Sequence, residues 1–161
     1  MKESGADRAK RILGVAPGEQ IGTSPWVKVT QDDIDEFARV TRDPDPMHID
    51  PEWCAEQGPF PTTIAFGFLS LSLITHMSHE AREWAPGVYG LNYGFDRMRF
   101  VAPVPVGSRI RGHFKLASAE PRDDGSVMTK TDVTVEIDGD ERPALVAEWL
   151  GVFYAGEKAA A

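Results

Sequence analysis

The chain has 161 residues, 42% of them hydrophobic and 26% charged, which is enough for one domain with a proper core. It carries 17 Lys and Arg against 25 Asp and Glu, a formal net charge of −8. Such a surface repels phosphate backbones and argues against a nucleic-acid partner. The single cysteine, Cys54, excludes an internal disulfide and a CxxC-type metal or redox site.

No targeting or membrane segment is expected. Residues 1–11 are polar and charged, without the apolar core of a signal peptide. The longest uncharged apolar stretch, residues 64–77, is shorter than the roughly 18–20 residues that a spanning helix needs. We therefore expect a cytoplasmic protein with no membrane partner.

The N-terminal region predicts short elements. Residues 6–13 predict a helix that ends near Gly14, and residues 26–29 predict a short strand. Thr30 begins an amphipathic helix, with Asp33 in the position of a capping box.

Prolines then divide the chain. The helix ends where Asp43-Pro44-Asp45-Pro46 removes amide donors and disfavours helical dihedral angles. Asp50-Pro51 supplies an N-cap and a proline at the first helical position, so a second helix is expected there. It is short, because Gly58-Pro59 ends it.

The most apolar segment predicts a central helix over about residues 64–83. Its large side chains surround the helical wheel, and a helix that is apolar all round is buried. We expect Leu69, Leu73 and Met77 to be covered by the strands that follow.

From Val88 onward the apolar residues recur with a period of two, which indicates half-buried antiparallel strands. Asp124-Gly125 and Asp138-Gly139 supply hairpin turns. The clearest strands are expected over residues 109–116, 127–137 and 144–154. The chain is thus predicted to be α+β, an antiparallel sheet wrapped around a long central helix.

Among the four histidines, His48 has the surroundings most typical of a catalytic site, because Asp43, Asp45 and Asp50 all lie within five residues of it. A carboxylate can orient an imidazole that takes a proton from water. The alternative from composition alone is a turn with two helix caps, in which Asp43 closes one helix and Asp50 opens the next.

The other candidates are weaker. His76 and His79 have no third ligand nearby, so no metal site is expected. His113 is expected to be solvated on the polar face of a strand, and Cys54 to be a half-buried helix residue.

Gly67 stands at the expected start of the central helix. The first amides of a helix have no internal partner and carry partial positive charge. A glycine there lets a substrate carbonyl approach, or merely eases packing.

These motifs together resemble a known family. Asp43-x-x-Pro46-x-His48-x-Asp50, then Gly58-Pro-Phe, then Thr63-Ile-Ala-x-Gly67 are similar to the MaoC-like dehydratases, which include (R)-specific enoyl-CoA hydratases. Residues 92–100 and 103–107 resemble the NodN-like single-domain branch in particular.

The resemblance implies a single hot-dog domain over residues 21–155, after an N-terminal extension (1–20) and before a disordered tail (156–161). It implies a homodimer in fatty-acid metabolism that hydrates trans-2-enoyl-CoA to (R)-3-hydroxyacyl-CoA without a cofactor of its own. Asp43 and His48 would activate water. The Gly67 amide would bind the thioester oxygen, with Ala65, Phe66 and Thr75 as further substrate-binding residues.

The sequence departs from the family pattern at three positions, with Arg42 for Gly, Asp45 for Asn and Phe66 for His. Asp45 adds a like charge beside Asp43. Two alternatives therefore stay open: a hot-dog acyl-CoA thioesterase, and a non-catalytic acyl-CoA-binding protein.

Overall fold

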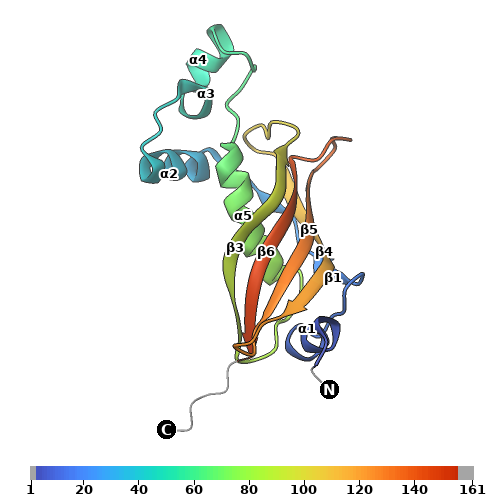
Figure 1. The fold of residues 1–161 in the computed structure, drawn as a ribbon. Coiled ribbons are helices and arrows are strands. Elements are labelled where there is room, and N and C mark those ends of the chain that lie inside the picture. Colours follow the sequence, from blue (N-terminus) through green and yellow to red (C-terminus); the bar gives the residue numbers. More distant parts are fainter. Residues whose placement is uncertain (1–2, 156–161) are drawn as a thin grey trace.

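The computed structural model describes residues 3–155, so the predicted tail over residues 156–161 lies outside the described residues. Figure 1 shows one sheet with a helix lying along it and smaller helices above the N-terminal end of that helix. The helices are α1 (Gly5–Leu13), α2 (Gln31–Thr41), α3 (Pro46–Ile49), α4 (Pro51–Glu56) and α5 (Gly67–Glu80). The strands are β1 (Gln20–Thr23), β2 (Val27–Lys28), β3 (Val88–Phe100), β4 (Arg109–Pro121), β5 (Val127–Ile137) and β6 (Leu145–Ala155).

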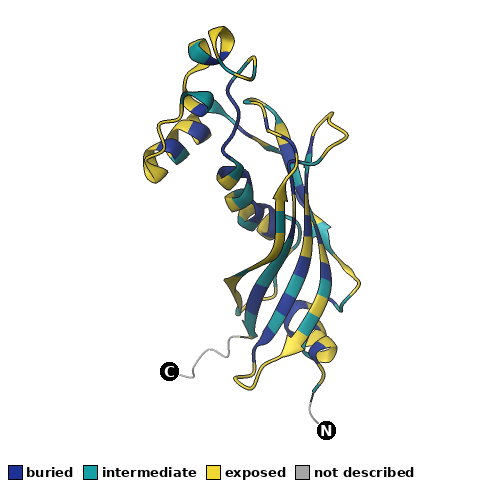
Figure 2. Cartoon of the chain, turned by 45° about the horizontal axis from the view of Figure 1, so that its top comes forward, coloured by how far each residue is buried: buried dark blue, intermediate teal, exposed yellow. Residues whose placement is uncertain are grey.

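The sheet is antiparallel throughout, with the strand order β1-β4-β5-β6-β3, and β2 also pairs with β4. Gly125 and Gly139 have φ angles of 84° and 80°, the left-handed conformation that the two predicted turns require. Burial alternates along β5, as predicted from its period of two (Figure 2). The α+β sheet-and-helix architecture is confirmed.

The central helix α5 is shorter than the predicted span of residues 64–83. It begins at Gly67 because the preceding segment is extended, with the Ala65 amide donating to the Val104 carbonyl at 2.8 Å. Leu69 and Met77 are buried in the core, whereas Leu73 is half-buried. The expectation of burial all round is wrong at Phe68, which is 64% exposed. No helix within residues 3–155 is long and apolar enough to cross a membrane.

The N-terminal extension is part of the packed structure. Ser4 caps α1, and Gly14 ends it in the left-handed conformation. Apolar residues of α1 form a second buried cluster with Leu116 of β4 and Val127 of β5. Strand β1, which the sequence analysis did not predict, is held by its pairing with β4.

Candidate active site

The two predicted catalytic residues lie close together in the chain, Asp43 in the tight turn between α2 and α3 and His48 on α3. Arg42 ends α2 with φ 60° and ψ 33°. One carboxylate oxygen of Asp43 accepts from the Asp45 amide at 3.2 Å, and Asp45 caps α3 by accepting from the Met47 amide at 2.9 Å. Because Asp45 caps the turn and Pro46 fits the first helical position, His48 lies on a short helix and not in a loop as predicted.

His48 is held in one tautomer. Its side chain is buried, and its Nδ1 lies 2.7 Å from the carbonyl oxygen of Ile64. A carbonyl oxygen only accepts, so Nδ1 carries the proton that it donates. In the neutral ring Nε2 is therefore unprotonated, and a lone pair there can take a proton from water.

Phe66 fixes the plane of the same ring. The His48 and Phe66 rings stack with centroids 3.8 Å apart and an angle of 29° between planes. Phe66 is itself buried and packs against Phe37 of α2 at 5.3 Å between centroids. These two contacts of the His48 ring, with the Ile64 carbonyl and with Phe66, thus come from the segment that leads into α5.

Gly67 presents free amide donors beside this ring. The N-cap residue of α5 is Phe66, whose side chain cannot cap the helix. Within residues 3–155 the amides of Gly67 and Phe68 make no recorded hydrogen bond, as expected for a first helical turn. A Cβ at Gly67 would lie 3.1 Å from the ring carbons of Phe100, so the glycine keeps a narrow space open. The Ala65 amide, in contrast, is used by Val104.

Asp43 and Thr75 do not contact this group in the structure. The Asp43 carboxylate is exposed beside a shallow depression that Arg39, Arg42 and Ile49 also line, and no hydrogen bond to His48 is recorded in the described part of the chain. Thr75 lies eight residues along α5 from Gly67, about 12 Å at 1.5 Å per residue. The structure therefore brings His48, Ala65, Phe66 and Gly67 together and leaves the other two residues apart.

Two other side-chain groups can be assessed. Burial raises the pKa of the Cys54 thiol, and the carboxylates of Asp50 and Asp45 raise it further, so this cysteine is a poor nucleophile. Across residues 3–155 no three His, Cys, Asp or Glu side chains are placed to hold a metal ion.

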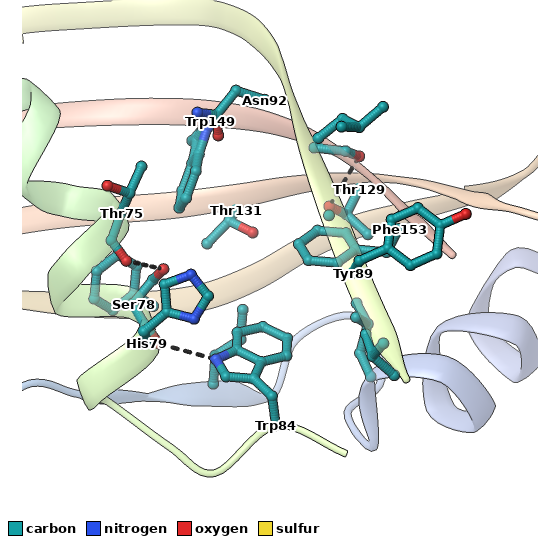
Figure 3. A pocket seen from close by; sticks show the side chains of 17 residues that line it. Thr75, Ser78, His79, Trp84, Tyr89, Asn92, Thr129, Thr131, Trp149 and Phe153 are labelled. Atoms are coloured by element: carbon teal, nitrogen blue, oxygen red, sulfur yellow. Dashed lines mark hydrogen bonds between the residues drawn. The ribbon is translucent and has the colours of Figure 1, made fainter. Parts of the chain in front are cut away.

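Sequence reasoning missed a pocket of about 370 Å³ between the C-terminal half of α5 and the inner face of the sheet (Figure 3). Thr75 lines it, together with residues of α1, β1, β3, β4, β5 and β6 and the segment after α5. No local pattern reveals such a pocket, because its walls come from elements far apart in the sequence.

Comparison with known proteins places the chain in a family. The chain is 43% identical to 3-hydroxyacyl-thioester dehydratase Z of Mycobacterium tuberculosis (strain ATCC 25618 / H37Rv) over 84% of its length and 89% of that protein's. It is also 43% identical to Nodulation protein N of Rhizobium leguminosarum bv. viciae, over 84% of each chain. The fold resembles that of the (R)-hydratase from A. caviae, with a TM-score of 0.68 and 19% identity over 85% of this chain and 96% of that one. The hot-dog architecture is thus confirmed. Since residues 13–137 match the family described as MaoC like domain, the chain belongs to the MaoC-like family.

Proposed function

We propose that the protein adds water to trans-2-enoyl-CoA to give (R)-3-hydroxyacyl-CoA, or catalyses the reverse dehydration. Its family and its dehydratase relative support an enzyme of the hydro-lyase class that acts on acyl thioesters. The single observation that carries the proposal is that the His48 ring, whose Nδ1 donates to the Ile64 carbonyl, stacks on Phe66, the residue directly before the uncapped start of α5.

His48 would act as the base. As the oxygen of water bonds to the β-carbon, Nε2 takes one proton from that water, and the same proton can then be delivered to the α-carbon. The Ile64 carbonyl, which accepts from Nδ1, stabilises the ring when it becomes positive. A positioned base supplies roughly 10² to 10⁴ in rate. Asp43, in the turn just before α3, would hold the water beside Nε2.

The Gly67 amide would bind the thioester oxygen, on which negative charge builds as water attacks. One such donor is worth roughly 3 kcal/mol in comparable sites. Phe66 and Ala65 would form the wall beside the reacting carbons. This chemistry uses acid–base steps and an amide dipole, so we propose that the protein has no cofactor of its own and that CoA arrives with the substrate.

The CoA phosphates need cationic partners. Arg109 and Arg111 already pair with Asp138 and Glu136 on neighbouring β5 and its turn. Arg97 and Arg99, both exposed on β3, have no ion pair recorded within residues 3–155 and are the better candidates. A cytoplasmic location stays a prediction from the sequence.

We also propose a homodimer formed through β3. Among the strands of residues 3–155, β3 pairs with β6 alone, which makes it an edge of the sheet. Its exposed apolar residues are Tyr89, Leu91, Tyr93, Phe95 and Phe100. A long apolar edge strand needs cover, and a second copy of the same strand provides it symmetrically. Sedimentation velocity should show a dimer that Leu91→Asp converts to monomer; a wild-type monomer at assay concentrations would contradict this.

The test of the reaction is an assay of the purified protein with crotonyl-CoA and with longer trans-2-enoyl-CoA substrates. Loss of enoyl absorbance with formation of the (R)-3-hydroxyacyl product is expected. Release of free CoA thiol, with the double bond of the acyl chain left intact, would instead identify a thioesterase. Binding of enoyl-CoA without any reaction would identify an acyl-CoA-binding protein.

A further inference from the structure

The pocket under α5 has a polar residue at its inner wall. Thr131, on β5, is only 7% exposed, and its side chain lines the pocket. The structure records no hydrogen bond for its hydroxyl among residues 3–155. No fully buried side-chain polar atom in that range lacks a partner, so the Thr131 hydroxyl faces open pocket space. Figure 3 shows it among the lining side chains, between Thr75 and Thr129.

The neighbouring hydroxyls are already committed as donors. Thr75 donates to the Ser72 carbonyl at 2.9 Å, Ser78 to the Thr75 carbonyl at 2.9 Å, and Thr129 to the Gly151 carbonyl at 3.3 Å. Among the serine and threonine hydroxyls that line the pocket, Thr131 is therefore the one that can both donate to and accept from a ligand. A buried hydroxyl that meets only a hydrocarbon chain loses its hydrogen bonds to water at a cost.

Aromatic rings form the rest of the wall. The Trp84 and Phe153 rings stack with centroids 5.7 Å apart and 8° between planes. Trp84 is also anchored by its indole N–H, which donates to the Ser78 carbonyl at 3.3 Å. Trp149 lines the opposite side. Such flat walls suit an apolar stem. Asn92 and His79 also line the pocket but are exposed, so Thr131 is its buried polar side chain whose hydroxyl is not already committed as a donor.

Helix α5 connects this pocket to the proposed reaction site. Gly67, Leu71 and Thr75 are spaced by four residues and share one face of the helix. An acyl chain whose thioester oxygen meets the Gly67 amide and which follows this face reaches Thr75, at the pocket, after about 12 Å.

We propose that this pocket receives the far end of the acyl group and selects chains that carry an oxygen function there, with Thr131 as the specificity-determining residue. The oxygen, of a hydroxyl or a carbonyl group, would hydrogen-bond the Thr131 hydroxyl while the rings hold the stem. This inference rests on the proposed function for the direction of the chain.

The test compares matched substrate pairs with the full chain. The pairs are hexenoyl-, octenoyl- and decenoyl-CoA, each as the trans-2 isomer with a plain or a hydroxylated chain end. At the length that reaches Thr131, the hydroxylated substrate should have about tenfold higher kcat/KM, the size of one neutral hydrogen bond. Thr131→Val should remove this preference by lowering kcat/KM for the hydroxylated substrate alone. The matched control is Thr134→Val, which changes an exposed threonine on the other face of β5 and should leave the preference unchanged.

Equal or lower kcat/KM for the hydroxylated substrate at every length, or a preference that Thr131→Val leaves intact, would overturn the inference. Calorimetry with the corresponding saturated acyl-CoA pairs measures the same preference without turnover. If no substrate is hydrated but the hydroxylated analogue still binds about tenfold tighter in a Thr131-dependent way, the proposed reaction fails and the pocket inference stands. If hydration proceeds but no substrate pair shows a preference, the proposed reaction stands and the pocket inference fails. Binding of neither analogue in any pair would contradict the inference as well.

Discussion

The imidazole of His48 stacks on the phenyl ring of Phe66, with centroids 3.8 Å apart and 29° between the planes, and Phe66 is the residue immediately before Gly67. One short segment therefore sets both the plane of the proposed base and the start of the helix whose amide would bind the thioester oxygen. The family resemblance implies a histidine at this position. Here an apolar ring takes that place and supports His48 by contact.

Phe66→Leu should distinguish the positioning of the His48 ring by Phe66 from the contribution of Phe66 to core packing. Leucine keeps much of the buried volume but not the flat face, so the free energy of unfolding should fall by about 1 kcal/mol. The hydration rate should fall by about tenfold, because the imidazole is no longer held in plane. The control is Phe37→Leu, which alters the other ring against Phe66 and should cost similar stability with little change in rate. Equal rates for the two variants would contradict a positioning role for Phe66.

Gly67→Ala should reduce activity without loss of stability. Alanine favours the helix by about 0.5–1 kcal/mol over glycine, which offsets crowding of the new Cβ against the Phe100 ring at 3.1 Å. The methyl group narrows the approach to the amide, so kcat/KM should fall by about tenfold or more. Ser72→Ala, at an exposed position of the same helix, should leave both quantities near wild type. Full activity of Gly67→Ala would count against the proposed oxyanion site.

The sequence predicted those features that local chemistry determines. The capping box at Thr30 and Asp33 and the end of α1 at Gly14 are found as predicted, because each depends on residues within one turn. His113 was expected to be solvated, yet its Nδ1 lies 3.1 Å from the Thr23 hydroxyl and its Nε2 lies 2.7 Å from a Glu136 carboxylate oxygen. These partners are 90 and 23 residues away, so sheet register decides them and no local pattern reveals them.

The candidate site also has features that local sequence predicts and features that depend on the fold. The turn residues and the helix start could be predicted from prolines, caps and a glycine. The contact of His48 with the Ile64 carbonyl, which sets its tautomer, spans 16 residues and depends on how α3 packs against the segment before α5. The Thr131 pocket was missed because its walls come from strands and helices that only the fold brings together.

Stability should depend on pH through Glu136. Hydrogen bonds from Arg111, and then from His113, lower the pKa of Glu136 below its usual value of 4.5. The unfolded chain therefore binds this proton at a higher pH than the folded one, so the stabilisation is present above pH 4.5 and is lost as pH falls through the lowered value. Glu136→Gln should cost no more than about 1 kcal/mol at pH 7 for this half-exposed group, and should flatten the acid limb of the stability curve. An unchanged acid limb would show that the pair contributes nothing to folding.

Arg42 holds a backbone conformation that favours glycine, with φ 60° at the end of α2. Arg42→Gly should relieve about 1–2 kcal/mol of backbone strain in the folded state. Glycine also loses more conformational entropy on folding, which costs about 0.5–1 kcal/mol. The free energy of unfolding should therefore stay unchanged or rise slightly. Arg39→Gly, inside the same helix, should instead destabilise by about 1 kcal/mol. Thermal unfolding of the two variants measures the contrast, and equal losses would show that position 42 carries no strain.

The most direct test of the central claim compares hydration by wild type, Asp43→Asn, His48→Ala and the double variant, each checked for intact fold by circular dichroism. If His48 takes the proton from a water that Asp43 holds, each single change should lower kcat by roughly 10² or more. The double variant should be little slower than the slower single one, because the two residues act as a unit on one water. Hydration near the wild-type rate in either folded single variant would contradict this mechanism.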